Sequence, residues 1–551
     1  MSYNEHAVRE RPAAYTASAE HEARAFVEEL TATLAPLLRE SHLASWNAAV
    51  GEGDDAEERS ARARAAVKHL YADPERAARV KGWLASGQVR DPLLRRQLVL
   101  LDLEYTGSQL PEETIEDLVR RSASLEQTFY TFRASLDGER VTNNVLLDVL
   151  RDERGSARRR EAWEASKQVG REVAEPLREL VRRRNEAARS LGFDNFYAME
   201  LQLQELDEER LFRILDGLRE ESDPAFRRLR DEMDATLAER YGVPSEELRP
   251  WHWGDFFGQE VPSVSTVDLD GMFRDVDLER TAAEFFHGIG LPVEDVLARS
   301  DLYEREGKDQ HAFCIDVDRE GDVRTLCNLR PNEKWASTLL HELGHAAYDK
   351  FIPRALPFLL RTPAHTLSTE SIAMYMGRLT RKPEWLREVV GAELGDEEAA
   401  EIRRQLRAAM LVSARWILVM VHFERELYRD PDRGDLNTLW WDLVERMQFI
   451  RRPEGRDEPD WAAKIHFSTA PVYYHNYLLG ELMASQLTAH LARGEMRGRR
   501  SGSIRGVEAV GRFLRERIFA PGASLDWNEL LVHATGEGLN PHYFVEEFVS
   551  A

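Results

Sequence analysis

The chain has 551 residues, of which 43% are hydrophobic and 31% are charged, a composition typical of a globular protein with a large core. Its formal net charge of -24 argues against a nucleic-acid partner. It has no continuous run of about 18 apolar residues to span a membrane, and Met1–His6 lacks the apolar core of a signal peptide. We therefore expect a cytoplasmic protein without membrane contact.

The first half of the chain predicts helices. We expect residues 1–18 to form a flexible tail. From Glu20 to about Leu248, Ala, Leu, Arg and Glu dominate and Gly and Pro are few, which predicts amphipathic helices. Residues 249–262 are aromatic and loop-like. Such a loop either lines a cleft or packs between helices, and the sequence leaves both open.

A β-hairpin is predicted in the middle of the chain. His311–Asp316 and Val323–Leu329 are strand-like, and Asp318–Asp322 between them has the composition of a turn. An edge strand of this kind can pair with the backbone of a peptide. After residue 380 the pattern is helical again.

The segment that follows the hairpin predicts a metal-binding helix. Apolar residues recur at helical spacing over residues 332–351, and Pro331-Asn332 supplies a start signal. His341 and His345 are four residues apart, so they share one face of the helix and both can bind one zinc ion. Glu342 lies beside them, where it can take a proton from a water molecule at the metal.

Glu370 is the predicted third ligand. It begins a second helix-like run over residues 370–379, with Ser368 or Thr369 as its cap. Three protein ligands leave one tetrahedral position open, which is the arrangement of a catalytic zinc site. His365 is therefore expected to be a loop residue and not a ligand. The sequence predicts a mostly α zinc hydrolase with a small β-sheet next to a site for one Zn²⁺ ion.

These motifs resemble the gluzincin peptidases typified by angiotensin-converting enzyme and thimet oligopeptidase, including oligoendopeptidase F, and their shorter bacterial relatives. The resemblance covers about Arg182 to Leu491. Glu370 follows His345 by 25 residues, the spacing of the thimet oligopeptidase type and one more than in the converting enzyme. The pair His311-Ala312 begins 30 residues before His341, as a substrate-binding His-Ala pair does in the converting-enzyme family.

A later segment extends the resemblance. Lys464-Ile465-His466 and Tyr474-His475-Asn476-Tyr477 resemble the family's Lys-x-His and Tyr-x-x-Tyr motifs, with one residue shifted between them. The resemblance implies that Tyr477 and His466, assisted by Tyr474, donate hydrogen bonds to the negative oxygen that forms during catalysis. It also implies that Lys464 binds the C-terminal carboxylate of a substrate.

The resemblance also implies an architecture. Two helical halves are expected to enclose a deep channel with the zinc site near its floor, within one fold over residues 19–551. Residues 19–250 would supply a wall or lid and residues 251–551 the catalytic region, so that short peptides are the substrates. One position departs from the pattern: many gluzincins have an aspartate four residues after the ligand glutamate, and this chain has Met374, which cannot accept a hydrogen bond from a zinc-binding histidine.

Several functions remain open at this stage. A zinc peptidase could release C-terminal dipeptides or cut internal bonds as an oligoendopeptidase. The same zinc and base could instead hydrolyse a non-peptide amide. A non-catalytic scaffold that only binds peptides is a further alternative, although retention of Glu342 argues against it. The sequence makes no prediction of oligomeric state.

Overall fold

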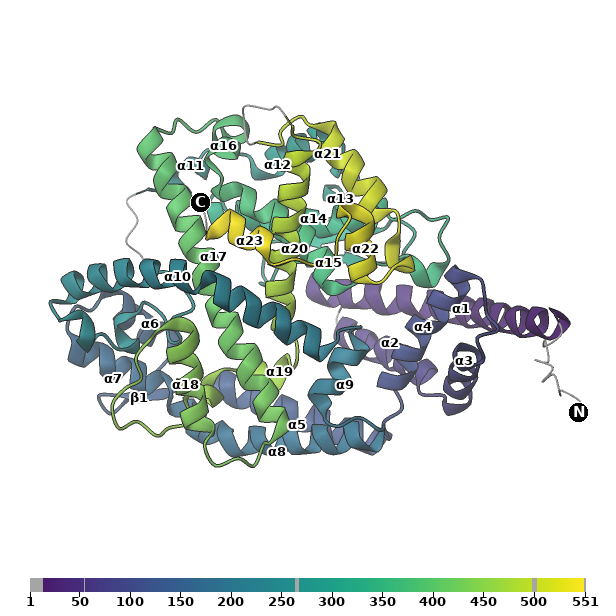
Figure 1. Cartoon of the computed structure of the whole chain (residues 1–551), viewed down its shortest axis with the longest axis horizontal. Coiled ribbons are helices and arrows are strands. Elements are labelled where there is room, and N and C mark those ends of the chain that lie inside the picture. Colours follow the sequence, from purple (N-terminus) through teal and green to yellow (C-terminus); the bar gives the residue numbers. More distant parts are fainter. Residues whose placement is uncertain (1–12, 54, 263–266, 498–502, 550–551) are drawn as a thin grey trace, which may run out of the picture.

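The computed structural model describes residues 13–53, 55–262, 267–497 and 503–549 of the chain (Figure 1). The described residues are mostly helical, with two small sheets of two antiparallel strands each. This confirms the predicted mostly α fold class with a small β component. The two halves around a channel stay a prediction.

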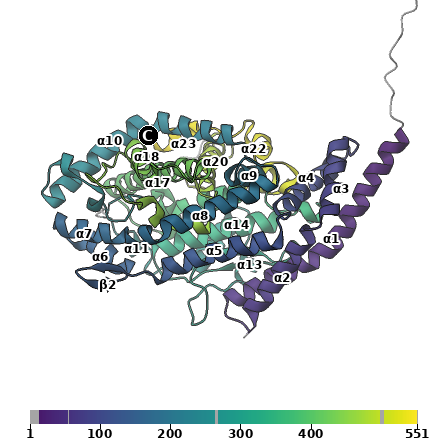
Figure 2. The same cartoon turned by 90° about the horizontal axis from the view of Figure 1, so that it is seen from below.

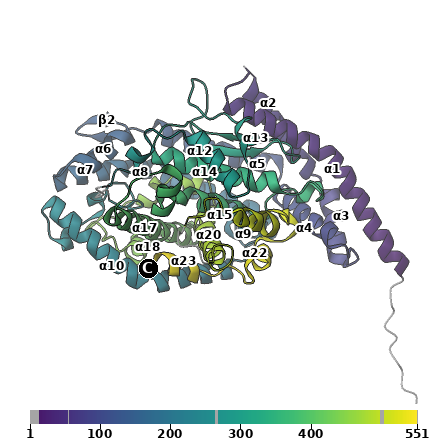
Figure 3. The ribbon, with the colours of Figure 1, turned by 90° about the horizontal axis from the view of Figure 1, so that it is seen from above.

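Four N-terminal helices gather at one end of the molecule, and Figures 2 and 3 show the long first helix running along its side: α1 (Ala13–Ala49), α2 (Ala56–Tyr71), α3 (Pro74–Ser86) and α4 (Pro92–Gly107). They share a small core in which Phe26, Leu30 and Leu98 are buried. The predicted tail is wrong for residues 13–18, which form the start of α1, because this alanine-rich stretch favours a helix. Residues 1–12 lie outside the described residues.

Six further α-helices are described before residue 250: α5 (Glu112–Thr131), α6 (Asn143–Asp152), α7 (Ser156–Ser166), α8 (Gln168–Ser190), α9 (Phe196–Leu203) and α10 (Glu208–Tyr241). They bear out the helical expectation, but a hairpin of β1 (Ala134–Leu136) and β2 (Glu139–Val141) was not predicted. Its signal is the turn Asp137-Gly138, in which both residues have positive φ, of 57° and 81°.

The remaining described helices begin after the aromatic loop: α11 (Leu269–Phe273), α12 (Leu278–Gly288), α13 (Glu294–Leu297), α14 (Glu333–Phe351), α15 (Thr366–Gly377), α16 (Pro383–Trp385), α17 (Asp396–Arg429), α18 (Leu436–Gln448), α19 (His466–Thr469), α20 (His475–Arg493), α21 (Glu508–Phe513), α22 (Trp527–Thr535) and α23 (His542–Phe548). By length and composition α17 could cross a membrane, but 72% of its apolar window is buried inside the protein, as in the core helix of a globular fold.

The largest hydrophobic core joins both sides of the proposed boundary at residue 250. Leu177 and Phe226 from the first half belong to the same buried cluster as Leu343 and Phe423 from the second. The described core therefore divides more clearly between α4 and α5 than at residue 250, because helices α1–α4 pack mainly into a separate cluster.

The predicted central hairpin is confirmed. Strands β3 (Phe313–Asp316) and β4 (Val323–Leu326) pair antiparallel, with Phe313 opposite Leu326. Both strands pack against α14, so the small sheet lies next to the helix that carries the zinc motif.

Candidate active site

Helix α14 begins where the sequence predicts. The side chain of Asn332 accepts a hydrogen bond from the Trp335 backbone N–H and caps the first turn. His341 and His345 follow on one face, with half-buried side chains that are 29% and 16% exposed. A small molecule can therefore reach both imidazoles.

Helix α15 begins four residues earlier than predicted. Its cap is His365, whose Nδ1 accepts a hydrogen bond from the Leu367 N–H, and not Ser368 or Thr369. The hydroxyl of Ser368 instead lies inside the first turn and donates to the His365 carbonyl. His365 thus caps this helix through Nδ1, and that it is not a ligand stays a prediction.

Two glycines allow the helices around Glu370 to approach closely. A Cβ atom added to Gly344 of α14 would lie 2.8 Å from the Cα of Ala373 on α15. One added to Gly480 of α20 would lie 3.3 Å from the Cβ of Glu370. Because neither position has a side chain, α15 fits between α14 and α20 and its glutamate reaches the histidines.

The three predicted ligands converge. His341 Nε2 lies 3.2 Å from His345 Nε2 and 3.7 Å from a carboxylate oxygen of Glu370, and all three ligand atoms lie within 4.8 Å of one another. Tetrahedral zinc with bonds of about 2.0–2.1 Å separates its ligand atoms by roughly 3.3 Å. The predicted metal ligands are therefore brought together at a spacing that suits zinc.

The protonation of the histidines also fits a metal. Burial lowers the pKa of His341 to about 4 and that of His345 to about 3, so both imidazoles are neutral at pH 7. His345 Nδ1 lies 2.7 Å from the hydroxyl of Thr369. When Nδ1 donates there, Nε2 turns an unprotonated lone pair toward the site. Thr369 thus supplies the hydrogen-bond partner that Met374 cannot.

Glu342 lies next to the ligands in a buried environment. Burial raises its pKa to about 8, with a further contribution from repulsion by Glu370. A divalent cation at the ligands would oppose this shift and favour the carboxylate form. Glu342 is then suited to accept a proton at neutral pH.

Lys464 is a buried lysine whose ammonium group contacts a neutral amide. Its Nζ donates to Gln259 Oε1 at 2.9 Å, and only 8% of the residue is exposed. Burial lowers its pKa to about 8, although the more distant charges of Asp255 and Glu260 oppose the shift. No carboxylate within the described ranges forms an ion pair with it, so it can bind one from a substrate.

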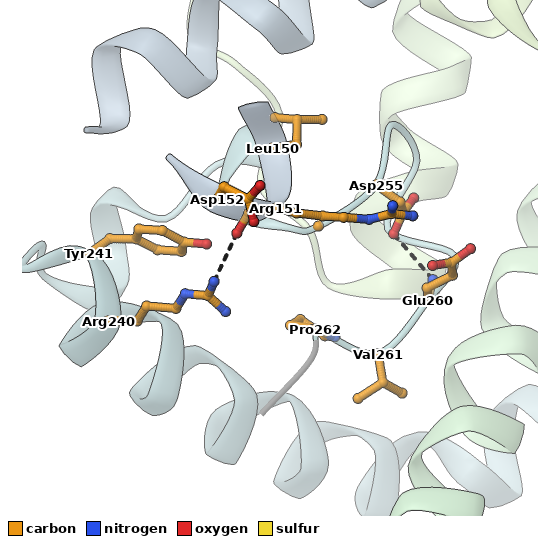
Figure 4. A pocket seen from close by; sticks show the side chains of 10 residues that line it. Leu150, Arg151, Asp152, Arg240, Tyr241, Asp255, Glu260, Val261 and Pro262 are labelled. Carbon is orange, nitrogen blue, oxygen red and sulfur yellow. Dashed lines mark hydrogen bonds between the residues drawn. The ribbon is translucent and has the colours of Figure 1, made fainter. Parts of the chain in front are cut away.

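Gln259 lies in a tight turn between Asp255 and Glu260, and these two residues line a cavity of about 340 Å³ (Figure 4). The carboxylate of Asp255 accepts hydrogen bonds from the backbone N–H groups of Phe257, Gln259 and Glu260, at 2.8, 3.2 and 3.2 Å. The aromatic loop therefore both lines a cavity and packs into the core, where Trp251 and Trp253 are buried.

Aromatic side chains connect Lys464 to the predicted catalytic residues. Lys464 Nζ lies 5.9 Å from the ring centre of Tyr474, and the His466 ring lies 5.1 Å from that ring. The hydroxyl of Tyr474 accepts a hydrogen bond of 3.0 Å from the indole N–H of Trp416, which leaves its proton free to donate. His466 is neutral, because burial lowers its pKa to about 4, and its buried Nδ1 has no protein partner among the described residues.

The aromatic contacts continue from Tyr474 through Tyr477 to Tyr473, close to Glu370. The ring of Tyr477 lies 5.5 Å from that of Tyr474 and 5.3 Å from that of Tyr473. Burial and the nearby Glu481 raise the pKa of Glu370 to about 7, and the neighbouring Tyr473 side chain opposes this shift. The predicted residues Lys464, His466, Tyr474 and Tyr477 are thus placed together with the zinc ligands.

The pair His311-Ala312 lies at the start of the hairpin. The His311 side chain is 93% exposed and its Nδ1 lies 3.1 Å from Asp309 Oδ1, while Ala312 packs partly buried against the core. Neither side chain has a described contact with the zinc ligands. Their substrate-binding role stays a prediction.

Sequence reasoning missed Gln259, Tyr473 and Trp416. Tyr473 adjoins the noted Tyr-x-x-Tyr motif, and Gln259 lies in the aromatic loop that was noted as a candidate cleft wall. Trp416 lies inside α17, where a tryptophan carries no signal beyond core packing.

The comparison with protein families settles the class of this site. The sequence profile of the family described as angiotensin-converting enzyme (Peptidase_M2) matches residues 17–541. The chain belongs to the angiotensin-converting enzyme family. It is therefore a metallopeptidase of the gluzincin type, and the peptidases of this family act on peptides and depend on zinc.

Proposed function

We propose that this metallopeptidase binds one zinc ion per chain and releases dipeptides from the free C-termini of short peptides. The observation that carries the proposal is Lys464, a buried ammonium group hydrogen-bonded to Gln259 and without an ion-pair partner among the described residues. Such a group favours binding of a carboxylate.

The metal side of the mechanism follows from the ligand set. Zinc held by His341, His345 and Glu370 would lower the pKa of a water molecule and polarise the scissile carbonyl. Glu342 takes the proton of the attacking water and passes it to the leaving amine. The negative charge that develops on the carbonyl oxygen would be met by the Tyr477 hydroxyl and an N–H of neutral His466.

The substrate side fixes which bond is cut. Lys464 binds the terminal carboxylate, and Tyr474, held by Trp416, lies between Lys464 and the catalytic donors. An anchored terminus would present the bond two residues from the end to Glu342. The predicted role of His311-Ala312 is to hold the substrate backbone at the edge of the hairpin.

A second candidate is an oligoendopeptidase, which the 25-residue spacing between His345 and Glu370 favours. In that case Lys464 would not select a terminus and internal bonds would be cut. A zinc hydrolase of non-peptide amides and a peptide-binding scaffold would use the same ligands without peptide cleavage.

A mixed library of short peptides, analysed by mass spectrometry with zinc-loaded and metal-free protein, tests the proposal. We expect zinc-dependent loss of two residues from the C-terminus as the dominant product. Dominant internal cleavage would establish the oligoendopeptidase. Unchanged peptides in the presence of bound zinc would overturn both peptidase assignments.

A further inference from the structure

The segment that carries Tyr474 and Tyr477 begins with a strained turn. Val472 has a positive φ of 52°, and its side chain is fully buried. A β-branched residue is rare in this conformation because its side chain crowds the backbone. Such a conformation persists only where the surrounding structure imposes it. The two tyrosines follow directly, so the groups that hold the turn also set where the tyrosine hydroxyl groups lie.

The amide of Gln204, at the end of α9, bonds to this segment both before and after Tyr474. Its Nε2 donates to the Val472 carbonyl at 3.0 Å, and its Oε1 accepts from Asn476 Nδ2 at 3.0 Å. His475 Nε2 lies 3.1 Å from the same oxygen, and because an amide oxygen can only accept, the imidazole donates. Both His475 and Asn476 are 1% exposed, so these bonds are shielded from water.

A second side chain holds the turn at one point. The carboxylate of Glu424, on α17, accepts a hydrogen bond of 2.9 Å from the Val472 N–H. This bond fixes the turn itself. Gln204 does more, because it links the turn to the first residues of α20, where Tyr477 lies.

Gln204 is itself fixed through the next residue. Glu205 has a positive φ of 54°, and its carboxylate accepts two hydrogen bonds from the guanidinium of Arg96 on α4, one of them from Nη2 at 2.7 Å. The two side chains are only 11% and 19% exposed, which limits screening by solvent. Trp527 Nε1 donates to the Glu205 carbonyl at 3.1 Å. The backbone after α9 is therefore held by α4 and by α22.

We propose that Gln204 is a positioning residue for the hydroxyl groups of Tyr474 and Tyr477, and that the ion pair of Arg96 and Glu205 holds Gln204 in place. Donors must meet the carbonyl oxygen where its charge develops, and a displacement of about 1 Å can cost about 100-fold in rate. The contacts form a continuous path from the N-terminal helices to the catalytic segment. The inference rests on the proposed function in taking the two tyrosines as catalytic donors.

The main test is Gln204→Met, which keeps the length of the side chain and removes its hydrogen bonds. Gln202→Met, at an exposed position in the last turn of α9, is the matched control. With zinc-loaded protein and a short peptide, we expect kcat of Gln204→Met to fall by about 10–100-fold while zinc content and KM change little. The control should behave as wild type. An unchanged kcat, or a loss confined to KM, would overturn the proposal.

Adding Tyr477→Phe separates positioning from a general structural role. If Gln204 acts through this tyrosine, the double variant should lose little more than the more damaging single variant, because the two residues act as one unit. Losses that multiply fully would contradict the proposal. So would a lowered melting temperature with a wild-type kcat for the folded, zinc-bound protein, since that is the signature of a structural role alone.

Arg96→Lys tests the far end of the path without touching the buried segment. Lysine keeps the charge but not the two-pronged geometry, so kcat should fall, by less than in Gln204→Met. Arg95→Lys, at the exposed neighbouring position, should have no effect. An unchanged kcat in Arg96→Lys would overturn the role of the ion pair, and it would overturn the whole proposal if Gln204→Met does not fold.

Hydrogen exchange of residues 472–477, followed by mass spectrometry without substrate, keeps this result apart from the proposed function. We expect faster exchange in Gln204→Met than in Gln202→Met, because the segment loses its constraint. Equal exchange in the two variants would contradict the positioning role. A wild-type protein that binds zinc but cleaves no peptide would defeat the proposed function and leave the exchange measurement readable.

Discussion

The two sides of the active site are held together in different ways. On the metal side, His341 and His345 share one helix, and close packing of α14 and α15 at Gly344 brings Glu370 to them. On the substrate side, residues 464–477 are mostly turns and short helices, fixed by hydrogen bonds that Arg184 and Gln204 donate and that Glu424 accepts. Regular helix geometry builds the first side, and buried polar side chains from distant segments build the second.

This difference predicts that zinc binding and substrate selection can be altered separately. The metal side should tolerate changes on the substrate side without losing zinc. Changes on the substrate side should alter which peptides are cut.

The largest expected effect is on catalysis by the metal side. Replacing Glu342 with Gln removes the base but keeps the shape of the side chain, so zinc should remain bound while kcat falls by about 10²–10⁴-fold. Metal analysis and peptide turnover measured on the same sample check this. Unchanged turnover would show that another group takes the proton.

The next effect is on substrate binding. Lys464→Ala should lower kcat/KM for peptides with a free C-terminus by about 10–100-fold, because a hydrogen bond to a charged group contributes about 1.5–3 kcal/mol. Zinc content should not change. Lys334→Ala, at an exposed position on α14, is the matched control and should behave as wild type. Equal losses in the two variants would remove Lys464 from the site.

A smaller effect is expected on the pH dependence of kcat/KM, through the charge of Lys464. Burial lowers the pKa of Lys464 to about 8, so its charged form is lost as the pH rises through that value. The kcat/KM for free-acid peptides should therefore fall above pH 8 in the wild type. Lys464→Arg keeps its charge at every pH in this range, and its profile should lack that decline. An identical alkaline decline in both proteins would assign it to another group.

The smallest predicted effect is on stability. Gly344→Ala forces a methyl group against the backbone of Ala373 and should lower the free energy of unfolding by about 1–3 kcal/mol. Gly217→Ala on α10 is the control, because no atom lies within 4 Å of the added Cβ, and it should raise stability by about 0.5–1 kcal/mol. Chemical denaturation of both variants measures the contrast. A neutral Gly344→Ala would show that α14 and α15 can separate without cost.

The same contrast explains how far the sequence could predict this site. His341, His345 and Glu370 follow from helical periodicity and short spacings, which local sequence records. Gln259 and Lys464 are 205 residues apart and meet only through the tertiary fold. The extra residue before Tyr474 is visible as a shift in the motif, whereas the positive φ of Val472 and its hydrogen bonds with Gln204 and Glu424 depend on the tertiary fold.

The sequence does not predict the start of α15 or the β1–β2 hairpin, and both differences have physical reasons. Ser368 and Thr369 have the composition of a helix cap and predict a start at Glu370, whereas the ring of His365 accepts the capping hydrogen bond and α15 starts earlier. The β1–β2 hairpin was missed because its strands have three residues each, too few to show alternation in a helical background.

The central claim is that a free C-terminus, bound by Lys464, directs the zinc site to one bond. The most direct measurement compares one good peptide substrate as the free acid and as the C-terminal amide, with products identified by mass spectrometry. We predict that the acid loses its C-terminal dipeptide and that the amide is cleaved poorly, to the same low level as the acid with Lys464→Ala. Equal cleavage of acid and amide at the same bond would contradict the account.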